Sequence, residues 1–525
     1  MNIHLVQETS RLIIAFPTVI ASFLCRHGSI ATRDLRSRSM FKRLMLAAFL
    51  LATILTAAVL LRAVLAKSRQ FPPETRQPMT LNDETAAAHL SEALQCKTVS
   101  YMDQTRFSGD EFRKLHACIK KAYPGIHARM QREFVNQYSL MYTWPGNDPT
   151  LEPILLLAHL DVVTAEESPL AWTHPPFGGV IAEGCVWGRG ALDDKGRLMA
   201  ILEAAETLVQ AGYMPQRTIY LALGHDEELN GEQGAAHMAS LLKIRGVQAE
   251  FSVDEGLVIT DGIVPGVARP LALVALADKG YASFELLVKQ EGGHSSQPPP
   301  ETSIEILAAA LTRINRHPMP VRSEGLMGLT LDYATPEMSL PYRVLFSNRW
   351  LFGGLITREL EQAPATNAGL RTTITATMFN AGEKDNMLPS TARAVVNCRL
   401  LPGDTIERVR NHIREVMGDD RIEMNVLPGA HNASPVSDHA ARGYQAIEKS
   451  IRHVWPAVAV APSLDIGDND SRNYAKVAVN QYRFTPFWFT EQELAMIHGV
   501  NERVSIRRYM EAIQYYIQLI RYAAG

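Results

Sequence analysis

The chain has 525 residues, of which 20% are charged and 46% hydrophobic, an ordinary balance for a globular protein with two or three domains. The formal net charge of -3 gives no electrostatic reason to expect a nucleic acid as partner. The five cysteines lack CxxC spacing, so neither a zinc ribbon nor a disulfide framework is indicated. We expect unpaired core cysteines, with one bridge between Cys96 and Cys118 as the alternative.

The N-terminal region predicts one membrane-spanning helix. Its uncharged run from Leu44 to Leu61 is rich in Leu, Ala, Ile and Val, and is just long enough to cross the hydrocarbon core of a bilayer. More positive charges precede the run than follow it, so the positive-inside rule places the remaining chain on the extracytoplasmic side. The alternative is a cleaved signal peptide that begins near Met40, in which case the protein would be secreted. We favour the anchor because no clean small-residue cleavage site follows the run.

Beyond a polar linker, strands and helices are expected to alternate. The expected helices cover residues 81–94, 109–122, 197–211, 235–245, 440–454 and 506–523. The expected strands cover residues 138–144, 154–158, 218–223 and 249–253. This alternation predicts an α/β fold, with a mostly parallel sheet flanked by helices.

A second pattern interrupts the first from about residue 281 to about residue 430. Its strands are expected at 282–289, 372–379, 392–400 and 421–427, and its helices at 302–314 and 405–416. This β-α-β-β-α-β order predicts an inserted ferredoxin-like dimerisation domain. The chain would then divide into an N-terminal segment (1–70), a catalytic domain in two parts (71–280 and 431–525) and the insertion (281–430). The additional segment 318–370 has no role that its sequence indicates.

Histidine and carboxylate side chains gather where three of the expected strands end. They are His159 and Asp161, then Glu227 and Glu228, then Asp254 and Glu255, with Asp193 and Asp194 in a glycine-punctuated loop between the first two strands. The carboxyl ends of parallel strands meet at one edge of a sheet. Adjacent buried acids are costly unless a cation neutralises them, so we expect a pair of divalent cations at this edge. Structural alternatives exist, such as Asp194 capping the helix that follows it.

Five separated motifs follow one order along the chain. They are His159-x-Asp161, Gly188-Arg189-Gly190 with Asp193-Asp194-Lys195-Gly196, Asp226-Glu227-Glu228, Asp254-Glu255-Gly256 and Ile497-His498-Gly499. Together they resemble the co-catalytic zinc metallopeptidases, the family of carboxypeptidase S, aminoacylase and the bacterial glutamate carboxypeptidases. Segments such as His294-Ser295-Ser296 resemble the branch of carboxypeptidase S and the secreted N-fatty-acyl amino acid hydrolases. The likeness extends from about Leu81 to the C-terminus.

The resemblance implies two zinc ions per chain, for which Co2+ or Mn2+ could substitute. The ligands that it implies are His159, Asp193 as the bridge between both ions, Glu228, His498 and one acid of the pair Asp254-Glu255. For this last ligand we take Asp254, with Glu255 as its rival. Ligation by histidine and carboxylate without sulfur is compatible with zinc.

The resemblance also implies roles in proton transfer. Glu227 would be the general base, which takes a proton from the attacking water and later gives it to the leaving amine. Asp161 would hold the ring of His159 from behind.

Three further residues match substrate-binding positions of the family. His294 matches a histidine that reaches into the partner subunit's site of a homodimer to steady the oxyanion, and its alternative is a solvent-facing turn residue. Arg472 and Asn386 match positions that hold the free carboxylate of the substrate, a task for which the guanidinium fork is suited. A structural ion pair is the alternative for Arg472.

The activity implied is hydrolysis, by metal-activated water, of the amide bond next to a free amino-acid carboxylate. The substrate would be a small peptide or an N-acyl amino acid. A metal-free binding relative anchored at the membrane is the alternative from another class, and it is disfavoured because every implied ligand and the base are present. A single-zinc esterase or deacetylase is disfavoured because a bridging Asp193 implies two ions.

Overall fold

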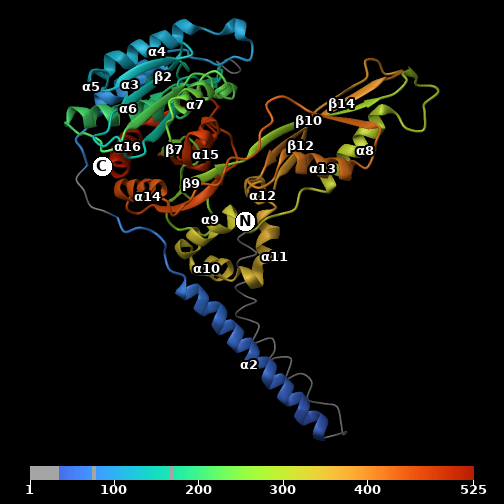
Figure 1. Ribbon diagram of the computed structural model, residues 1–525. Coiled ribbons are helices and arrows are strands. Elements are labelled where there is room, and N and C mark those ends of the chain that lie inside the picture. The colour runs from blue at the N-terminus through green and yellow to red at the C-terminus, as the bar shows by residue number, and fades with distance from the viewer. Residues whose placement is uncertain (1–34, 74–77, 166–170) are drawn as a thin grey trace.

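The chain forms a large α/β body, a smaller sheet beside it and one long helix below (Figure 1). The computed structural model describes residues 35–73, 78–165 and 171–525. The helices expected from the sequence are present in the large body, and its four expected strands are joined by six that the sequence analysis did not specify.

The large body is built on a ten-stranded sheet with the order β1-β2-β6-β3-β7-β17-β9-β8-β18, to which β16 adds by pairing with β9. The bounds are β1 (Gln131–Val135), β2 (Ser139–Trp144), β3 (Ile154–His159), β6 (Ile219–Gly224), β7 (Ala249–Asp254), β8 (Ile259–Thr260), β9 (Leu271–Asp278), β16 (Ala459–Asp465), β17 (Ala478–Arg483) and β18 (Trp488–Phe489). Strands β6, β3, β7 and β17 run parallel, whereas β1 and β2 add antiparallel at one edge. The predicted α/β fold with a mostly parallel sheet is confirmed.

Helices cover both faces of this sheet. They are α3 (Asp83–Leu94), α4 (Gly109–Ala122), α5 (Pro124–Arg129), α6 (Lys195–Gln210), α7 (Ala235–Ile244), α14 (Arg442–Val454) and α16 (Ile506–Ala524), with the 3-10 helices η3 (Glu227–Leu229) and η5 (Asp470–Lys476) and the short α15 (Glu491–Leu494). Strand β3 is buried throughout because its side chains alternate between two cores. Leu156 joins the core with α6 and α16, whereas Leu155 joins the core with α7.

A small antiparallel sheet, with the order β12-β14-β10-β15, stands beside the large body (Figure 1). Its strands are β10 (Gly280–Lys289), β12 (Thr373–Ala381), β14 (Thr391–Leu400) and β15 (Ile422–Val426), and its helices are α8 (Ser303–Arg316) and α13 (Ile406–Met417). Both helices pack on one face and close a separate core. Strand β12 is an edge strand with residues 375–380 exposed. A short pair, β11 (Gly293–His294) with β13 (Met387–Leu388), extends from this sheet.

The segment 318–370, for which the sequence indicated no role, is mostly helical. Its helices are α9 (Leu326–Ala334), α10 (Leu340–Ser347), α11 (Arg349–Leu360) and α12 (Pro364–Leu370). Helix α9 packs on β16, where Leu331 and Ala334 meet Ala459 and Ala461 in one buried cluster. This cluster ties the segment to the far edge of the large sheet.

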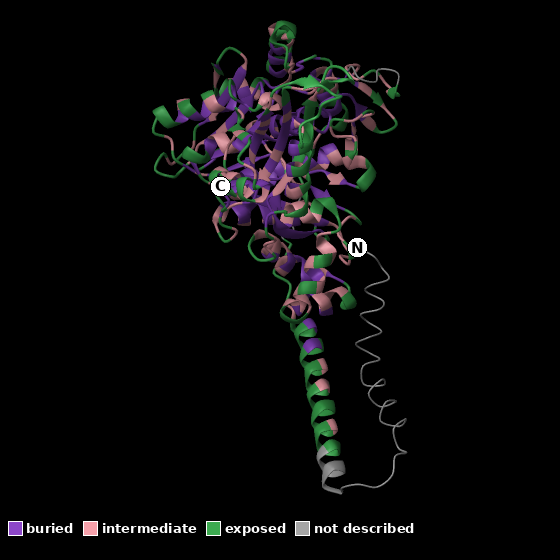
Figure 2. Cartoon of the chain, turned by 90° about the vertical axis from the view of Figure 1, so that its right-hand side faces the viewer, coloured by how far each residue is buried: buried purple, intermediate pink, exposed green. Residues whose placement is uncertain are grey.

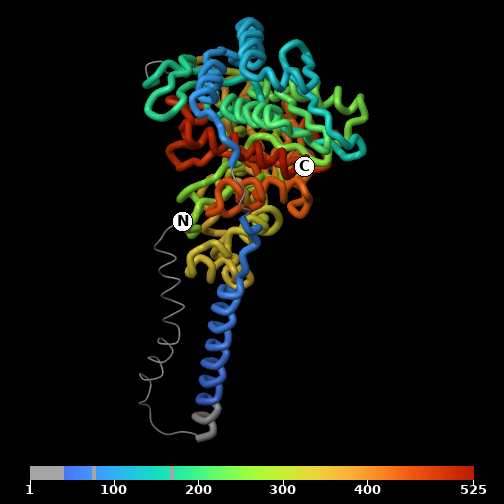
Figure 3. Tube along the Cα trace, turned by 90° about the vertical axis from the view of Figure 1, so that its left-hand side faces the viewer, coloured from blue at the N-terminus to red at the C-terminus, as the bar shows by residue number. Residues whose placement is uncertain are grey.

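The long helix is α2 (Leu35–Leu65), which is exposed along most of its length (Figure 2). Among the described residues, it is the one helix long and apolar enough to cross a membrane, over Phe41–Leu65. The described residues that follow α2, up to residue 73, run along the large body (Figure 3). The thiols of Cys96 and Cys118 are 4.0 Å apart and free, in agreement with the expectation of unpaired cysteines.

Candidate metal centre

Three parallel strands deliver the acidic cluster to one edge of the large sheet. His159 is the last residue of β3, Glu227 and Glu228 follow β6 in η3, and Asp254 is the last residue of β7. Asp193 enters from the loop that precedes α6, and His498 from the loop that follows α15. The strands pair in register, so their carboxyl ends converge although the residues are far apart in sequence.

Asp193 lies between the two histidines and offers one carboxylate oxygen to each. Its Oδ1 is 3.0 Å from His159 Nε2, and its Oδ2 is 3.0 Å from His498 Nε2. Glu255 Oε1 approaches the first histidine to 3.4 Å, and Glu228 Oε2 approaches the second to 3.4 Å. The cluster therefore consists of two halves that share one carboxylate.

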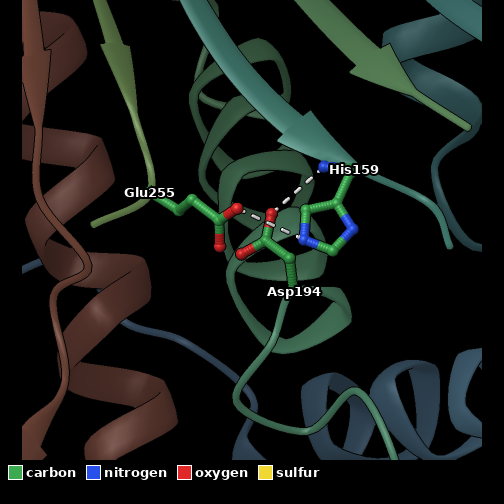
Figure 4. A group of neighbouring side chains, drawn as sticks. All are labelled: His159, Asp194 and Glu255. Carbon is green, nitrogen blue, oxygen red and sulfur yellow. Dashed lines mark hydrogen bonds and ion pairs between the residues drawn. The ribbon is translucent and has the colours of Figure 1, made fainter. Parts of the chain in front are cut away.

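Glu255 faces this cluster, and Asp254 does not. Figure 4 shows the Glu255 carboxylate directed at the His159 ring, while Asp194 lies beneath the backbone of His159 and accepts its N–H at 3.1 Å. Asp254 Oδ1 accepts from Arg197 Nη2 at 3.2 Å, and its buried Oδ2 has no hydrogen-bond partner within the described residues. Glu255, the rival that the sequence left open, is thus the acid of this pair that contacts His159.

Asp161 organises the cluster from behind. On the ring side opposite Asp193, His159 Nδ1 lies 3.0 Å from the backbone carbonyl of Asp161 and 3.3 Å from its buried carboxylate. The Asp161 carboxylate has further partners. It also accepts the backbone N–H groups of Glu227 at 3.2 Å and Glu228 at 3.1 Å, and the Ser100 hydroxyl at 2.7 Å. One carboxylate therefore orients a ring on β3 and the turn after β6 together.

Crowding of negative charge shifts the titration of the cluster. Burial and the charge of Glu255 raise the pKa of Glu227 well above its usual range. Burial and the charge of Asp193 raise the pKa of Glu255 to about 8. Hydrogen bonds to Asp193 and Glu228 raise the pKa of His498 to about 10. The side chains alone hold surplus negative charge that a cation would neutralise.

The donor set fits divalent cations. The cluster lines a cavity of about 220 Å³ that Asp193, Glu227, Glu228, Glu255 and His498 share. Glu228 Oε1 is buried there, and no hydrogen-bond partner reaches it within the described part of the chain. Groups of three such ligands lie close enough to hold an ion, among them Asp193, Glu228 and His498. A buried carboxylate oxygen without a partner is expected where a cation binds.

Two buried ion pairs hold the loop that carries Asp193. Arg189 Nη1 donates to Glu502 Oε2 at 2.6 Å, and Glu502 Oε1 accepts the N–H groups of Leu192 at 2.8 Å and Asp193 at 3.2 Å. Asp194 pairs with Arg197 at 2.7 Å instead of capping α6 with its side chain. Sequence reasoning assigned no role to Glu502 or Arg197. Its position gives one signal for Glu502, since it stands four residues after His498, just beyond the last motif.

The remaining expected site residues lie elsewhere. His294 is exposed on β11, where its Nδ1 is 2.8 Å from Ser296 Oγ. It shares a cavity of about 740 Å³ in the small sheet with Asn386, not the cavity of the acidic cluster. Arg472 is closer to that cluster, because it pairs with Asp468, which lines the acidic cavity, and donates to the carbonyl of Asn230 at 2.6 Å.

Sequence comparison identifies relatives of this arrangement. The family model described as peptidase family M20/M25/M40 matches residues 155–522. The mouse N-fatty-acyl-amino acid synthase/hydrolase PM20D1 is 39% identical over 466 residues, which cover 87% of this chain and 92% of the relative. The probable carboxypeptidase S-like 2 of Dictyostelium discoideum is 38% identical, covering 84% and 86%. Carboxypeptidase S of Saccharomyces cerevisiae is 31% identical, covering 78% of each chain.

Solved structures with a similar fold are more distant in sequence. An M20 family metallo-carboxypeptidase from Sulfolobus solfataricus superposes with a TM-score of 0.60 at 18% identity, covering 83% of this chain and 98% of its own. The YXEP protein of Bacillus subtilis, a dinuclear metal binding peptidase from the M20 family, gives 0.51 at 13% identity, covering 84% and 99%. At these identities the likeness concerns the fold.

Proposed function

The chain belongs to peptidase family M20/M25/M40, and from that premise we propose that it hydrolyses the amide bond next to a free amino-acid carboxylate. Two substrate classes are consistent with its relatives, N-acyl amino acids and small peptides with a free C-terminus. The observation that carries the proposal is Asp193, whose two oxygens each lie 3.0 Å from a different histidine. A carboxylate in that position can bridge two ions, which a histidine cannot do.

Two divalent ions, for which we propose zinc, would be held by five side chains. One ion would bind His159, Asp193 and Glu255, and the other Asp193, Glu228 and His498. When bound, the ions would lower the pKa of a water molecule and polarise the amide carbonyl. We propose Glu255 as the fifth ligand in place of Asp254, because Glu255 is the acid that lies 3.4 Å from His159.

Glu227 is proposed as the general base. Its side chain lines the cavity beside Glu228 and Glu255, and its backbone N–H is bound by Asp161. From there it would accept the proton of the attacking water and then donate that proton to the nitrogen of the leaving amine. Asp161 would keep the His159 ring and the Glu227 turn in register during this transfer.

We propose that the substrate carboxylate and the oxyanion are bound by Arg472, Asn386 and His294. Arg472 stands next to the acidic cavity, whereas Asn386 and His294 belong to the small sheet. A symmetric dimer would bring the second pair to the partner subunit's site. The exposed edge strand β12, with Met378 50% and Phe379 43% exposed, supports pairing of this kind.

Helix α2 is proposed as a single membrane anchor that leaves the hydrolase on the extracytoplasmic side. Its apolar surface is exposed to the surroundings and not packed in a core. If it is instead cleaved as a signal peptide, the mature protein would start after it and be secreted.

A substrate screen tests the function. Purified full-length protein in detergent would be given N-acyl amino acids and dipeptides, with and without a chelator, followed by Zn2+, Mn2+ or Co2+. Hydrolysis of one class that chelation abolishes and metal restores would support the proposal and identify the substrate. If metal-loaded protein bound these compounds without cleaving them, the non-catalytic binding relative would be the better description.

A further inference from the structure

The helical segment 318–370 packs against the C-terminal end of the apolar helix α2. Val59 and Ala63 of α2 are buried against Val344 of α10. Asn348, which follows α10, donates from its buried Nδ2 to the carbonyl of Val59 at 3.0 Å. The two elements are 289 positions apart in sequence, so this contact is a tertiary one. The segment is therefore held at a definite height on α2.

That height can be read from the charges that flank the apolar run. Arg43 precedes Leu44 and Arg62 follows Leu61, and at ~1.5 Å per residue the run between them measures about 27 Å, close to a hydrocarbon core. Val59 precedes Arg62 by three residues and thus lies about 4–5 Å deeper along the helix axis. The contact with Asn348 would lie at the boundary of the hydrocarbon.

A tryptophan stands beside this contact and is exposed. The indole Nε1 of Trp350 donates to Asn348 Oδ1 at 3.3 Å, so a chain of two hydrogen bonds connects it to Val59. Trp350 is 58% exposed, and Leu351, the next residue of α11, is 43% exposed. Tryptophan is enriched at membrane interfaces because its ring is apolar and its N–H needs a partner.

The linker after α2 is hydrogen-bonded to the large body, which limits how far the large body can tilt relative to α2. Gln70 exchanges hydrogen bonds with Val460 of β16 at 2.6 and 2.8 Å. The N–H of Phe71 donates to Glu448 at 2.9 Å, and its carbonyl accepts from Arg452 at 3.1 Å. Helix α2 is therefore attached to the large body in two ways, through its contact with the helical segment and through the linker residues Gln70 and Phe71 (Figure 3).

We propose that α10 and α11 (Leu340–Leu360) form a membrane foot, whose Trp350 and Leu351 enter the outer surface of the bilayer that α2 spans. The inference rests on the proposed membrane anchor. Lipid would cover this apolar surface. The surface belongs to the segment that is hydrogen-bonded to α2, and lipid would surround α2 at that height. The foot would hold the hydrolase at a fixed height above the membrane instead of on a free tether.

The tryptophans allow a direct test. All six lie among the described residues, and Trp350 is the exposed one. Full-length protein would be reconstituted into phosphatidylcholine vesicles with plain or brominated acyl chains, since bromine quenches only nearby tryptophans. We expect brominated lipid to reduce the emission of the wild type and of Trp488→Phe, a half-buried control, and this reduction to be lost in Trp350→Phe.

A second pair of variants tests the foot without removing the reporter. Leu351→Asp should lift Trp350 from the lipid and lower its quenching, whereas Ile244→Asp, at a site 83% exposed on α7, should leave quenching unchanged. Equal quenching in Leu351→Asp and the wild type would overturn the foot.

Flotation after a carbonate wash and a hydrolysis assay on the same vesicles separate the outcomes. Protein that stays in the vesicles and hydrolyses substrate while Trp350 is unquenched would overturn the foot and leave the anchor and the function standing. Protein that washes out would overturn both the anchor and the foot. Quenching without hydrolysis would support the foot and count against the proposed function.

Discussion

The metal centre and the cavity around His294 differ in how completely one chain builds them. In the metal centre His159 is buried and His498 is exposed, and the buried residues Asp161 and Glu502 hold the segments that carry the ligands in place. The cavity around His294 is larger and lined by exposed residues of the small sheet. Ligands must be prearranged to bind a metal, whereas groups that bind substrate can arrive with a second subunit. The predictions below test this difference, from the largest expected effect to the smallest.

Replacement of the shared carboxylate should have the largest effect. Asp193→Ala is expected to lose bound metal as well as activity, because each half of the centre loses a ligand. Elemental analysis of the purified variant beside the wild type measures this loss. If the variant still held two ions per chain, Asp193 would not be the bridge.

Glu227→Gln should separate chemistry from metal binding. The amide keeps the size of the side chain but cannot accept the proton, so turnover should fall at least ~100-fold. The metal content should stay near two ions per chain, because Glu227 is not among the proposed ligands. Activity above a few per cent of the wild type in a kinetic assay would rule out the role of Glu227 as base.

Glu255→Ala and Asp254→Asn form a matched pair at one strand end. The first should lose one of the two ions, since Glu255 faces His159 at 3.4 Å. The second should keep both ions and lose stability, because buried Arg197 would lose part of its negative partner. Metal counts and thermal unfolding distinguish them. If Asp254→Asn instead lost one ion and Glu255→Ala kept both, Asp254 would be the fifth ligand.

Mixed dimers test the outer cavity. His294→Ala and Glu227→Gln chains should each be inactive, and mixing them should restore activity, because half of the sites in each mixed dimer keep both residues. With random exchange, about a quarter of the wild-type rate is expected. Subunit exchange would be verified by pull-down with two tags. A mixture that exchanges but stays inactive would exclude a role of His294 in the neighbouring site.

Deletion of the anchor should have the smallest effect on the enzyme. A chain that starts at Ser68 keeps the Gln70 and Phe71 contacts and should be soluble and active, although loss of the Val59 contact lowers its melting temperature by no more than about 2–4 °C. A chain that starts at Pro72 loses those contacts too and should be less stable. If the chain that starts at Ser68 misfolded, α2 would be required for the hydrolase to fold.

The sequence by itself determined the elements and the kind of chemistry. The apolar run 154–158 and the periodicity of 109–122 predicted β3 and α4, because burial on both faces of a strand and on one face of a helix leaves a local pattern. Acidic pairs at strand ends predicted a cation site, because such pairs are conspicuous among apolar neighbours. The division into domains and the dimer stay predictions.

Only the tertiary structure decided which acid faces the cluster and what supports it. Asp254 and Glu255 are adjacent, and the choice between them depends on Arg197, 57 positions away. The pair Arg189 and Glu502, 313 positions apart, and the contact of Asn348 with α2 have the same origin. Sequence patterns report local burial, whereas these contacts depend on how distant elements pack, which leaves no periodicity in the chain.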